Sequence, residues 1–144
     1  MRAVWRFFDP AARATLASLA RDHADGLARA AAHMDALADR LATGLRATIA
    51  RHALPWHVAR VGARVEFVCA PGPLRNGTEA DAAHAPALER AIHLALLNRG
   101  CLIAPFHNMM LVSPATSPTQ VESLCDAFDA IAAALLAGNT LPES

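Results

Sequence analysis

Residues 97–113 read LNRGCLIAPFHNMMLVS and combine a helix end, an apolar run, a polar connection and a second apolar run. Arg99 followed by Gly100 is typical of a helix C-terminus, where a cation suits the last turn and glycine adopts a positive φ. Cys101–Pro105 predicts a buried strand that ends at a bend. Met109–Ser113 predicts a second strand after the connection.

The connection between these two runs is short and polar, and it consists of Phe106, His107 and Asn108. Rigid elements that present a polar loop often form a functional site. The same pattern also occurs at ordinary hairpin tips, where asparagine satisfies backbone groups. The residue types alone leave both interpretations open.

Helices are predicted on both sides of this stretch. Asp9-Pro10 predicts a helix start, with a short first helix, a break near Gly26 and a long second helix to about Arg51. Apolar side chains of the second helix recur at three- and four-residue steps and so share one face: Met34, Leu37, Leu41, Leu45 and Ile49. We interpret His33 and His52 as surface residues.

Two further strands are predicted between the helices, at residues 56–61 and 63–69, because polar and apolar residues alternate there on either side of Gly62. Residues 70–77 are rich in turn formers and predict a loop. Pro86 begins a helix that ends at Gly100, and its buried stripe is predicted to be Leu88, Ile92, Ala95 and Leu96.

The last helix is predicted from a capping box at Ser117-Pro-Thr-Gln120. Its apolar stripe comprises Val121, Leu124, Phe128, Ile131 and Leu135, and Gly138 ends it. The whole pattern predicts an α+β fold, in which a small antiparallel sheet of about four strands has helices packed on one face.

Composition limits the function classes. The 144 residues are 54% hydrophobic and 18% charged, which suits one globular core. The net charge is zero and the pI is about 7.1, so the charge predicts no nucleic-acid partner and no anionic membrane surface. No apolar segment is long enough to span a bilayer, and residues 1–9 make a poor signal peptide.

The cysteines and histidines do not form a recognisable reactive motif. Cys69, Cys101 and Cys125 are widely spaced in apolar sequence, which predicts buried thiols in a reducing compartment, the cytoplasm. The seven histidines show no metal-ligand spacing. We therefore predict no metal site, no cysteine nucleophile and, without a glycine-rich loop, no autonomous nucleotide site.

Three pieces of this part of the chain are Leu97 to Gly100, Pro105-Phe-His-Asn-Met109 and Ser113-Pro-Ala-Thr116. Together they resemble the C-terminal domain of class III pyridoxal-phosphate aminotransferases. The branch it resembles is that of glutamate-1-semialdehyde aminomutase. Further matching pieces occur in the same order along the chain and extend the resemblance over roughly residues 34–136: Gly44-Leu-Arg46, Leu54-Pro-Trp56, Arg60-Val-Gly62, Arg75-Asn-Gly77 and Glu79.

The resemblance implies the small domain of fold-type-I pyridoxal-phosphate enzymes. It divides the chain into an N-terminal helical segment, 1–30, that matches poorly, a small domain, 31–138, and a frayed tail, 139–144. It implies that a substrate- and cofactor-facing loop is formed by Phe106, His107, Asn108 and Met109. Asn108 falls where the aminomutase branch has a carboxylate, so the resemblance supports positioning there rather than proton transfer. Arg75 and Asn76 are a possible anion contact.

The 144 residues contain 13 arginines and no lysine. Enzymes of this family hold pyridoxal phosphate as an imine on a lysine amine, and arginine cannot replace it because the guanidinium stays protonated. We therefore expect the cofactor to belong to the parent family, with no covalent attachment site in these residues and no catalysis by them alone.

Two hypotheses of different class remain. In the first, the chain is part of an amino-group-transferring enzyme and works with a missing large domain that binds the cofactor. In the second, it is a free-standing α+β module that binds a small ligand or a protein. Under the first, we expect self-association through apolar surfaces that the large domain would cover.

Overall fold

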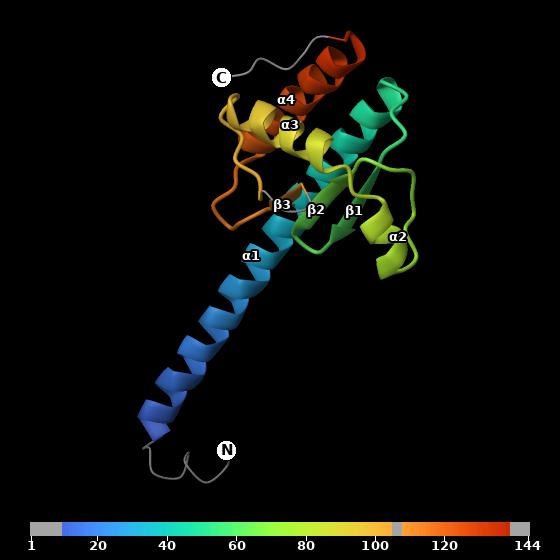
Figure 1. The fold of residues 1–144 in the computed structure, drawn as a ribbon. Coiled ribbons are helices and arrows are strands. Elements are labelled where there is room, and N and C mark those ends of the chain that lie inside the picture. Colours follow the sequence, from blue (N-terminus) through green and yellow to red (C-terminus); the bar gives the residue numbers. More distant parts are fainter. Residues whose placement is uncertain (1–9, 105–107, 139–144) are drawn as a thin grey trace. The chain divides into compact units, whose positions relative to one another are not determined.

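The longest element is α1, Pro10–Arg51, an uninterrupted helix of 42 residues (Figure 1). The computed structural model describes residues 10–104 and 108–138. The chain divides into two units, residues 1–33 and 34–144, and α1 contributes to both. The predicted break near Gly26 is wrong, because a helix-interior glycine costs only about 1 kcal/mol relative to alanine and the alanine- and leucine-rich sequence around this region favours a helix.

In the second unit α1 supplies one wall of the core. Leu37, Leu41, Leu45 and Ile49 are buried and Met34 is partly buried, which confirms the predicted stripe. The helix ends in a Schellman turn, in which the amide of Leu54 donates to the carbonyl of Ile49 at 3.0 Å.

The sheet is antiparallel and has the order β1-β2-β3, with β1 at His57–Val61, β2 at Arg64–Val68 and β3 at Met109–Leu111. A tight turn joins β1 to β2, and Gly62 adopts φ +55 there, where glycine has no steric penalty. Val58 pairs with Phe67, and Val65 pairs with Met110. Val65, Phe67 and Met110 are buried, so this face of the sheet packs against the helices.

The sheet has three strands among the described residues, where about four were expected. The missing strand is Cys101–Ala104, the described part of the predicted Cys101–Pro105. This segment is joined to β3 by a backbone hydrogen bond from the Ala104 N–H to the Met109 carbonyl, 2.9 Å long. Strand character depends on a ladder of such bonds, so the apolar pattern alone was misleading. Ile103 is nevertheless buried.

Three helices follow the hairpin: α2 at Gly77–Ala82, α3 at Pro86–Leu97 and α4 at Pro118–Leu136. The α2 helix was not predicted, because its six residues are too few for a periodic pattern. The predictions of α3 and α4 are confirmed. The Ser117 capping box is confirmed, because Ser117 Oγ accepts from Gln120 N–H at 3.2 Å and Gln120 Oε1 accepts from Ser117 N–H at 2.8 Å.

Aromatic side chains join the helices to the sheet. The ring centroids of Phe67 on β2 and Phe128 on α4 are 4.8 Å apart, and that of Trp56 lies 6.3 Å from each. Tilted and stacked pairs at these separations add to the stabilisation from burial. Within the described residues, none of the helices combines the length and hydrophobicity that a membrane span requires.

Candidate functional site

The Ala104 N–H donates to the Met109 carbonyl at 2.9 Å, and Asn108 lies directly before β3. Asn108 has 4% of its surface exposed and adopts φ +48, while Met109 is half-buried. Phe106 and His107 lie outside the described residues. The predicted role of Phe106, His107, Asn108 and Met109 in facing a substrate therefore stays a prediction.

The backbone conformation of Asn108 gives a structural reason for its residue type. Asparagine is enriched several-fold at positive φ because its short side chain tolerates that conformation. The burial of the residue also shows that its side chain is enclosed by the protein rather than displayed at a solvated loop tip. This geometry fits a role in the turn, and a contact of Asn108 with a bound molecule stays a prediction.

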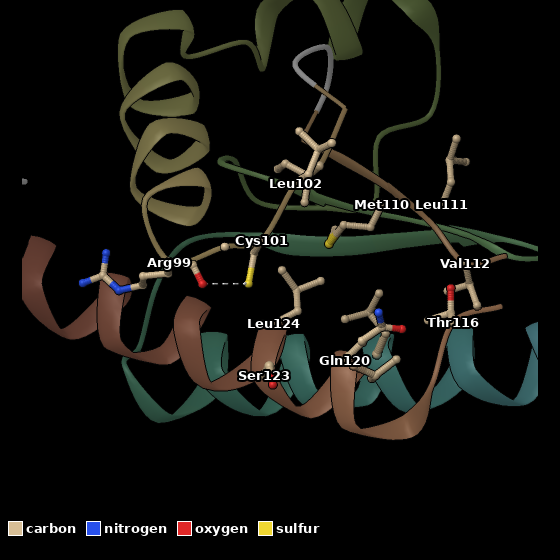
Figure 2. A pocket seen from close by; sticks show the side chains of 14 residues that line it. Arg99, Cys101, Leu102, Met110, Leu111, Val112, Thr116, Gln120, Ser123 and Leu124 are labelled. Carbon is tan, nitrogen blue, oxygen red and sulfur yellow. Dashed lines mark hydrogen bonds between the residues drawn. The ribbon is translucent and has the colours of Figure 1, made fainter. Parts of the chain in front are cut away.

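A cavity of about 560 Å³ is bounded by segment 99–103, β3 and the first turns of α4 (Figure 2). Apolar side chains dominate its walls, including Leu102, Met110 and Leu124. Leu102 is 81% exposed, and Leu111 on β3 is 64% exposed. The cavity was not predictable from the sequence, because its walls come from segments far apart in the chain.

Three of the polar side chains around this cavity, Arg99, Thr116 and Gln120, already have structural partners. Figure 2 shows the Arg99 guanidinium turned away from the cavity, and its Nη1 donates to the carbonyl of Ala95 at 3.0 Å. Thr116 Oγ1 accepts from Ser113 N–H at 2.9 Å, and Gln120 caps α4. The cavity therefore combines apolar side chains with polar groups that are already used in the fold.

The three thiols are held in their protonated form. Burial raises the pKa of Cys69 to about 12, and the nearby Glu89 carboxylate adds to the effect. Burial also raises the pKa of Cys101 and Cys125. Since the thiolate is the reactive species, none of these cysteines has the environment of a nucleophile. In the part of the chain that the structure describes, no group of three or more acidic, histidine and cysteine side chains could hold a metal ion.

Arg75 and Asn76 lie at the start of α2, where both bind Glu79. Asn76 is the N-cap and accepts from Glu79 N–H at 2.9 Å, while the Glu79 carboxylate accepts from the Arg75 backbone N–H at 2.8 Å. The Arg75 guanidinium is 3.2 Å from the same carboxylate and is 82% exposed. The geometry accounts for these residues as a helix cap, and their predicted contact with an anion stays a prediction.

His52 is more than a surface residue, because its Nε2 lies 3.0 Å from Oδ1 of Asp129 on α4. Arg51 Nη1 binds the same oxygen at 2.6 Å. Burial would raise the pKa of Asp129, but the hydrogen bond from His52 and the charge of Arg51 hold it below its ordinary value. This cluster joins the end of α1 to α4.

The arrangement of sheet, helices and loop occurs in known enzymes. The chain is 46% identical to a glutamate-1-semialdehyde aminomutase from Pseudomonas aeruginosa PAO1 over 71% of its length, with a TM-score of 0.69. The chain has a glutamate-1-semialdehyde aminomutase-type fold. A lysine-to-alanine variant of that aminomutase, in complex with PMP, gives the same values. The resemblance seen in the sequence is thereby confirmed.

More distant structures share the fold of this aminomutase-type domain. A transaminase with PLP bound is 18% identical and covers 77% of the chain, and a β-phenylalanine aminotransferase from Variovorax paradoxus is 22% identical and covers 71%; each has a TM-score of 0.62. The aminomutase-type domain spans 22% of the length of the Pseudomonas enzyme and 24% of each of these two. No family model matches the chain, and no curated protein matches it.

Proposed function

We propose that this chain is the C-terminal small-domain portion of a class III pyridoxal-phosphate enzyme of the glutamate-1-semialdehyde aminomutase type. In this role it contributes to amino-group transfer together with a larger portion that binds the cofactor. The observation that supports the proposal most strongly is the 46% identity to the Pseudomonas aminomutase over 71% of the chain. The loop at Asn108 would face the substrate in the assembled enzyme.

Pyridoxal phosphate is the cofactor that we propose for the assembled enzyme. The similar structures are reported with PMP and with PLP. The residues of this chain do not fit covalent attachment, because all 13 basic side chains are arginine and a guanidinium does not lose its proton in proteins. The lysine therefore has to come from outside these residues, and the chain alone does not turn over.

The partner in this proposal is the cofactor-binding portion, and the exposed apolar side chains support an interface. Val61, Leu102 and Leu111 are 79%, 81% and 64% exposed. Large apolar side chains gathered on a surface favour association, so the isolated chain also associates with itself. The three free thiols suit a reducing compartment, and we propose the cytoplasm.

A chimera tests the proposal. The matching part of the Pseudomonas aminomutase is replaced by this chain, and the purified chimera is assayed for cofactor absorbance and for conversion of glutamate-1-semialdehyde. We expect a folded chimera that binds the cofactor and turns over, because it contains both this chain and the cofactor-binding portion with which the chain is proposed to pack. A folded chimera that binds no cofactor and shows no turnover would contradict the proposal and favour a free-standing binding module.

The isolated chain provides a second test. After incubation with pyridoxal phosphate and reduction with borohydride, mass spectrometry is expected to find no stoichiometric adduct on an internal side chain, since no lysine amine is present. The Pseudomonas aminomutase treated in parallel is the positive control. An adduct on an internal residue of this chain would refute the claim that attachment comes from elsewhere.

A further inference from the structure

A second cavity, of about 570 Å³, lies where α1 ends and β1 begins, separate from the cavity of Figure 2. Its size is within the range of small-molecule sites. Its walls come from the end of α1, from β1 and from the loop at Gly72-Pro73, and they include Arg46, Leu54, Trp56, His57, Val58 and Pro73. We call it the Arg46 cavity.

The charge of the Arg46 cavity favours an anion. None of the residues that line it carries a carboxylate, and Arg46 supplies its guanidinium. The Arg46 guanidinium donates from Nη2 to the carbonyl of Val58 at 3.4 Å, which is long for an N–H···O bond. The planar fork of donors that arginine offers to a carboxylate is therefore little used by the protein itself.

His57 forms a rigid part of the wall. Its Nδ1 lies 2.7 Å from the carbonyl oxygen of Ala70, and because a carbonyl can only accept, Nδ1 carries the proton. Gly72 lies directly against the imidazole, since a Cβ at that position would be 2.4 Å from Cγ of His57. The ring is thus fixed from two sides, and a preformed wall lowers the entropic cost of binding.

The rest of the wall is apolar and also fixed. The Trp56 ring stacks against Phe67 at a centroid distance of 6.3 Å, so the core holds the indole in place. Leu54 and Pro73 add apolar surface beside it. By contrast, the cation beside the first cavity, Arg99, is turned away and bound to a carbonyl.

We propose that the Arg46 cavity binds a small organic monocarboxylate with a flat apolar body, such as an aromatic acid. The carboxylate accepts hydrogen bonds from the Arg46 guanidinium, and the apolar body lies against Trp56, Leu54 and Pro73. An aromatic ring gains from contact with the indole face. This inference does not depend on the amino-transfer function proposed above.

Benzoate and benzamide form a matched pair of probes, because they share a ring and differ in charge. The full chain labelled with ¹⁵N is titrated with each and followed by two-dimensional NMR, with the indole N–H of Trp56 as reporter. The Trp5→Phe variant lacks the other indole N–H of the sequence and so identifies the signal of Trp56. We expect benzoate to shift the signals of Arg46, Trp56 and His57 and to bind about tenfold or more tighter than benzamide, as charge-assisted hydrogen bonds imply. Inorganic phosphate, which lacks the apolar body, is expected to shift these signals much less.

Variants test whether Arg46 is the anchor. Arg46→Gln should reduce benzoate affinity to that of benzamide, a loss of about tenfold, while Arg29→Gln, an exposed arginine of α1 outside the cavity, should change nothing. Equal binding of benzoate and benzamide by the unaltered chain would overturn the proposal, and so would unchanged benzoate affinity in folded Arg46→Gln. The proposal would also be overturned if about 20 mM benzoate, a concentration far above the Kd of a specific site, caused no shift.

Discussion

A Cβ atom on Gly44 would lie 2.5 Å from Sγ of Cys125, so α1 and α4 approach each other here too closely for any larger residue. The two positions lie in different helices, and in the sequence most of the second unit lies between them. Around them, Arg40 pairs with Glu122, and Arg51 and His52 pair with Asp129. The contact therefore lies in the middle of the junction between these helices.

Gly44→Ala is expected to lower the free energy of unfolding by about 1–3 kcal/mol, because overpacking a filled interface forces neighbours to move. Gly26→Ala on the same helix is the matched control. It meets nothing within 4 Å, so it should raise the free energy of unfolding by up to about 1 kcal/mol through helix propensity. Urea unfolding measures both.

A double-mutant cycle identifies the cause of the Gly44→Ala effect. In the Cys125→Ala background the sulfur is gone, and the penalty of Gly44→Ala should fall by about 1 kcal/mol or more. An unchanged penalty would show that the contact with Cys125 is not responsible.

Ala53→Gly is expected to stabilise the chain. Ala53 adopts φ +50 in the Schellman turn that ends α1, and an L-residue in this conformation costs about 1–2 kcal/mol relative to its preferred one. Part of this gain is lost to the greater flexibility of glycine in the unfolded chain, which leaves roughly 0.5–1 kcal/mol. Ala50→Gly, three residues earlier inside the helix, should destabilise by about 1 kcal/mol. A change in the free energy of unfolding that has the same sign in both variants would contradict this explanation.

The stabilising effect of Asp129 should disappear in acid. Its folded-state pKa is lowered, so the carboxylate contributes stability above its unfolded pKa, near 3.8, and loses it as pH falls through the folded pKa. Asp129→Asn should therefore be less stable than the unaltered chain at pH 6 and should converge with it as the pH falls below 3.8. Asp25→Asn, an exposed position of α1, serves as the control. A difference that persists unchanged into acid would mean that the charge of Asp129 is not involved.

Asn108 permits a separation of turn and substrate roles within the aminomutase chimera. Asn108→Gly suits φ +48 and removes the amide, whereas Asn108→Ala removes the amide and also strains the turn. If the amide contacts substrate, both variants should lose about tenfold in kcat/KM, equivalent to roughly 1.4 kcal/mol. If it serves the turn alone, the glycine variant should retain its kinetics and its melting temperature.

Self-association should depend on the exposed leucines beside the first cavity. Leu102→Ser combined with Leu111→Ser is expected to weaken concentration-dependent association in analytical ultracentrifugation, because it removes two large apolar side chains from one patch. Leu27→Ser, at a leucine of the first unit that is 58% exposed, should have little effect. A monomeric unaltered chain at high concentration would contradict the expectation.

Features that depend on adjacent residues were predictable from the sequence. The Ser117 capping box and the turn at Gly62 are local, and the stripe of α1 follows from helical spacing. Cys101–Ala104 was wrongly predicted as a strand because strand character requires hydrogen bonds to a distant partner. The helix break at Gly26 was wrong because the flanking alanines outweigh one glycine.

The candidate sites were less accessible to sequence reasoning. The segment around Asn108 was found by its resemblance to the aminomutase branch, while the positive φ of Asn108 is seen only in the structure. The Arg46 cavity joins residues from α1, β1 and the loop at Gly72. No spacing rule connects these positions, and their juxtaposition follows only from the packed fold.

The pairing of α1 with α4 has a consequence for synthesis on the ribosome. The ion pairs between these helices join residues 82 and 78 positions apart, whereas the β1–β2 hairpin is local. At about 5–20 residues per second, α1 waits roughly 4–16 s for its partner helix to be made. Throughout that interval the part of its apolar face that packs against α4 is uncovered, so a nascent-chain chaperone would find a binding surface on α1 before the core is complete.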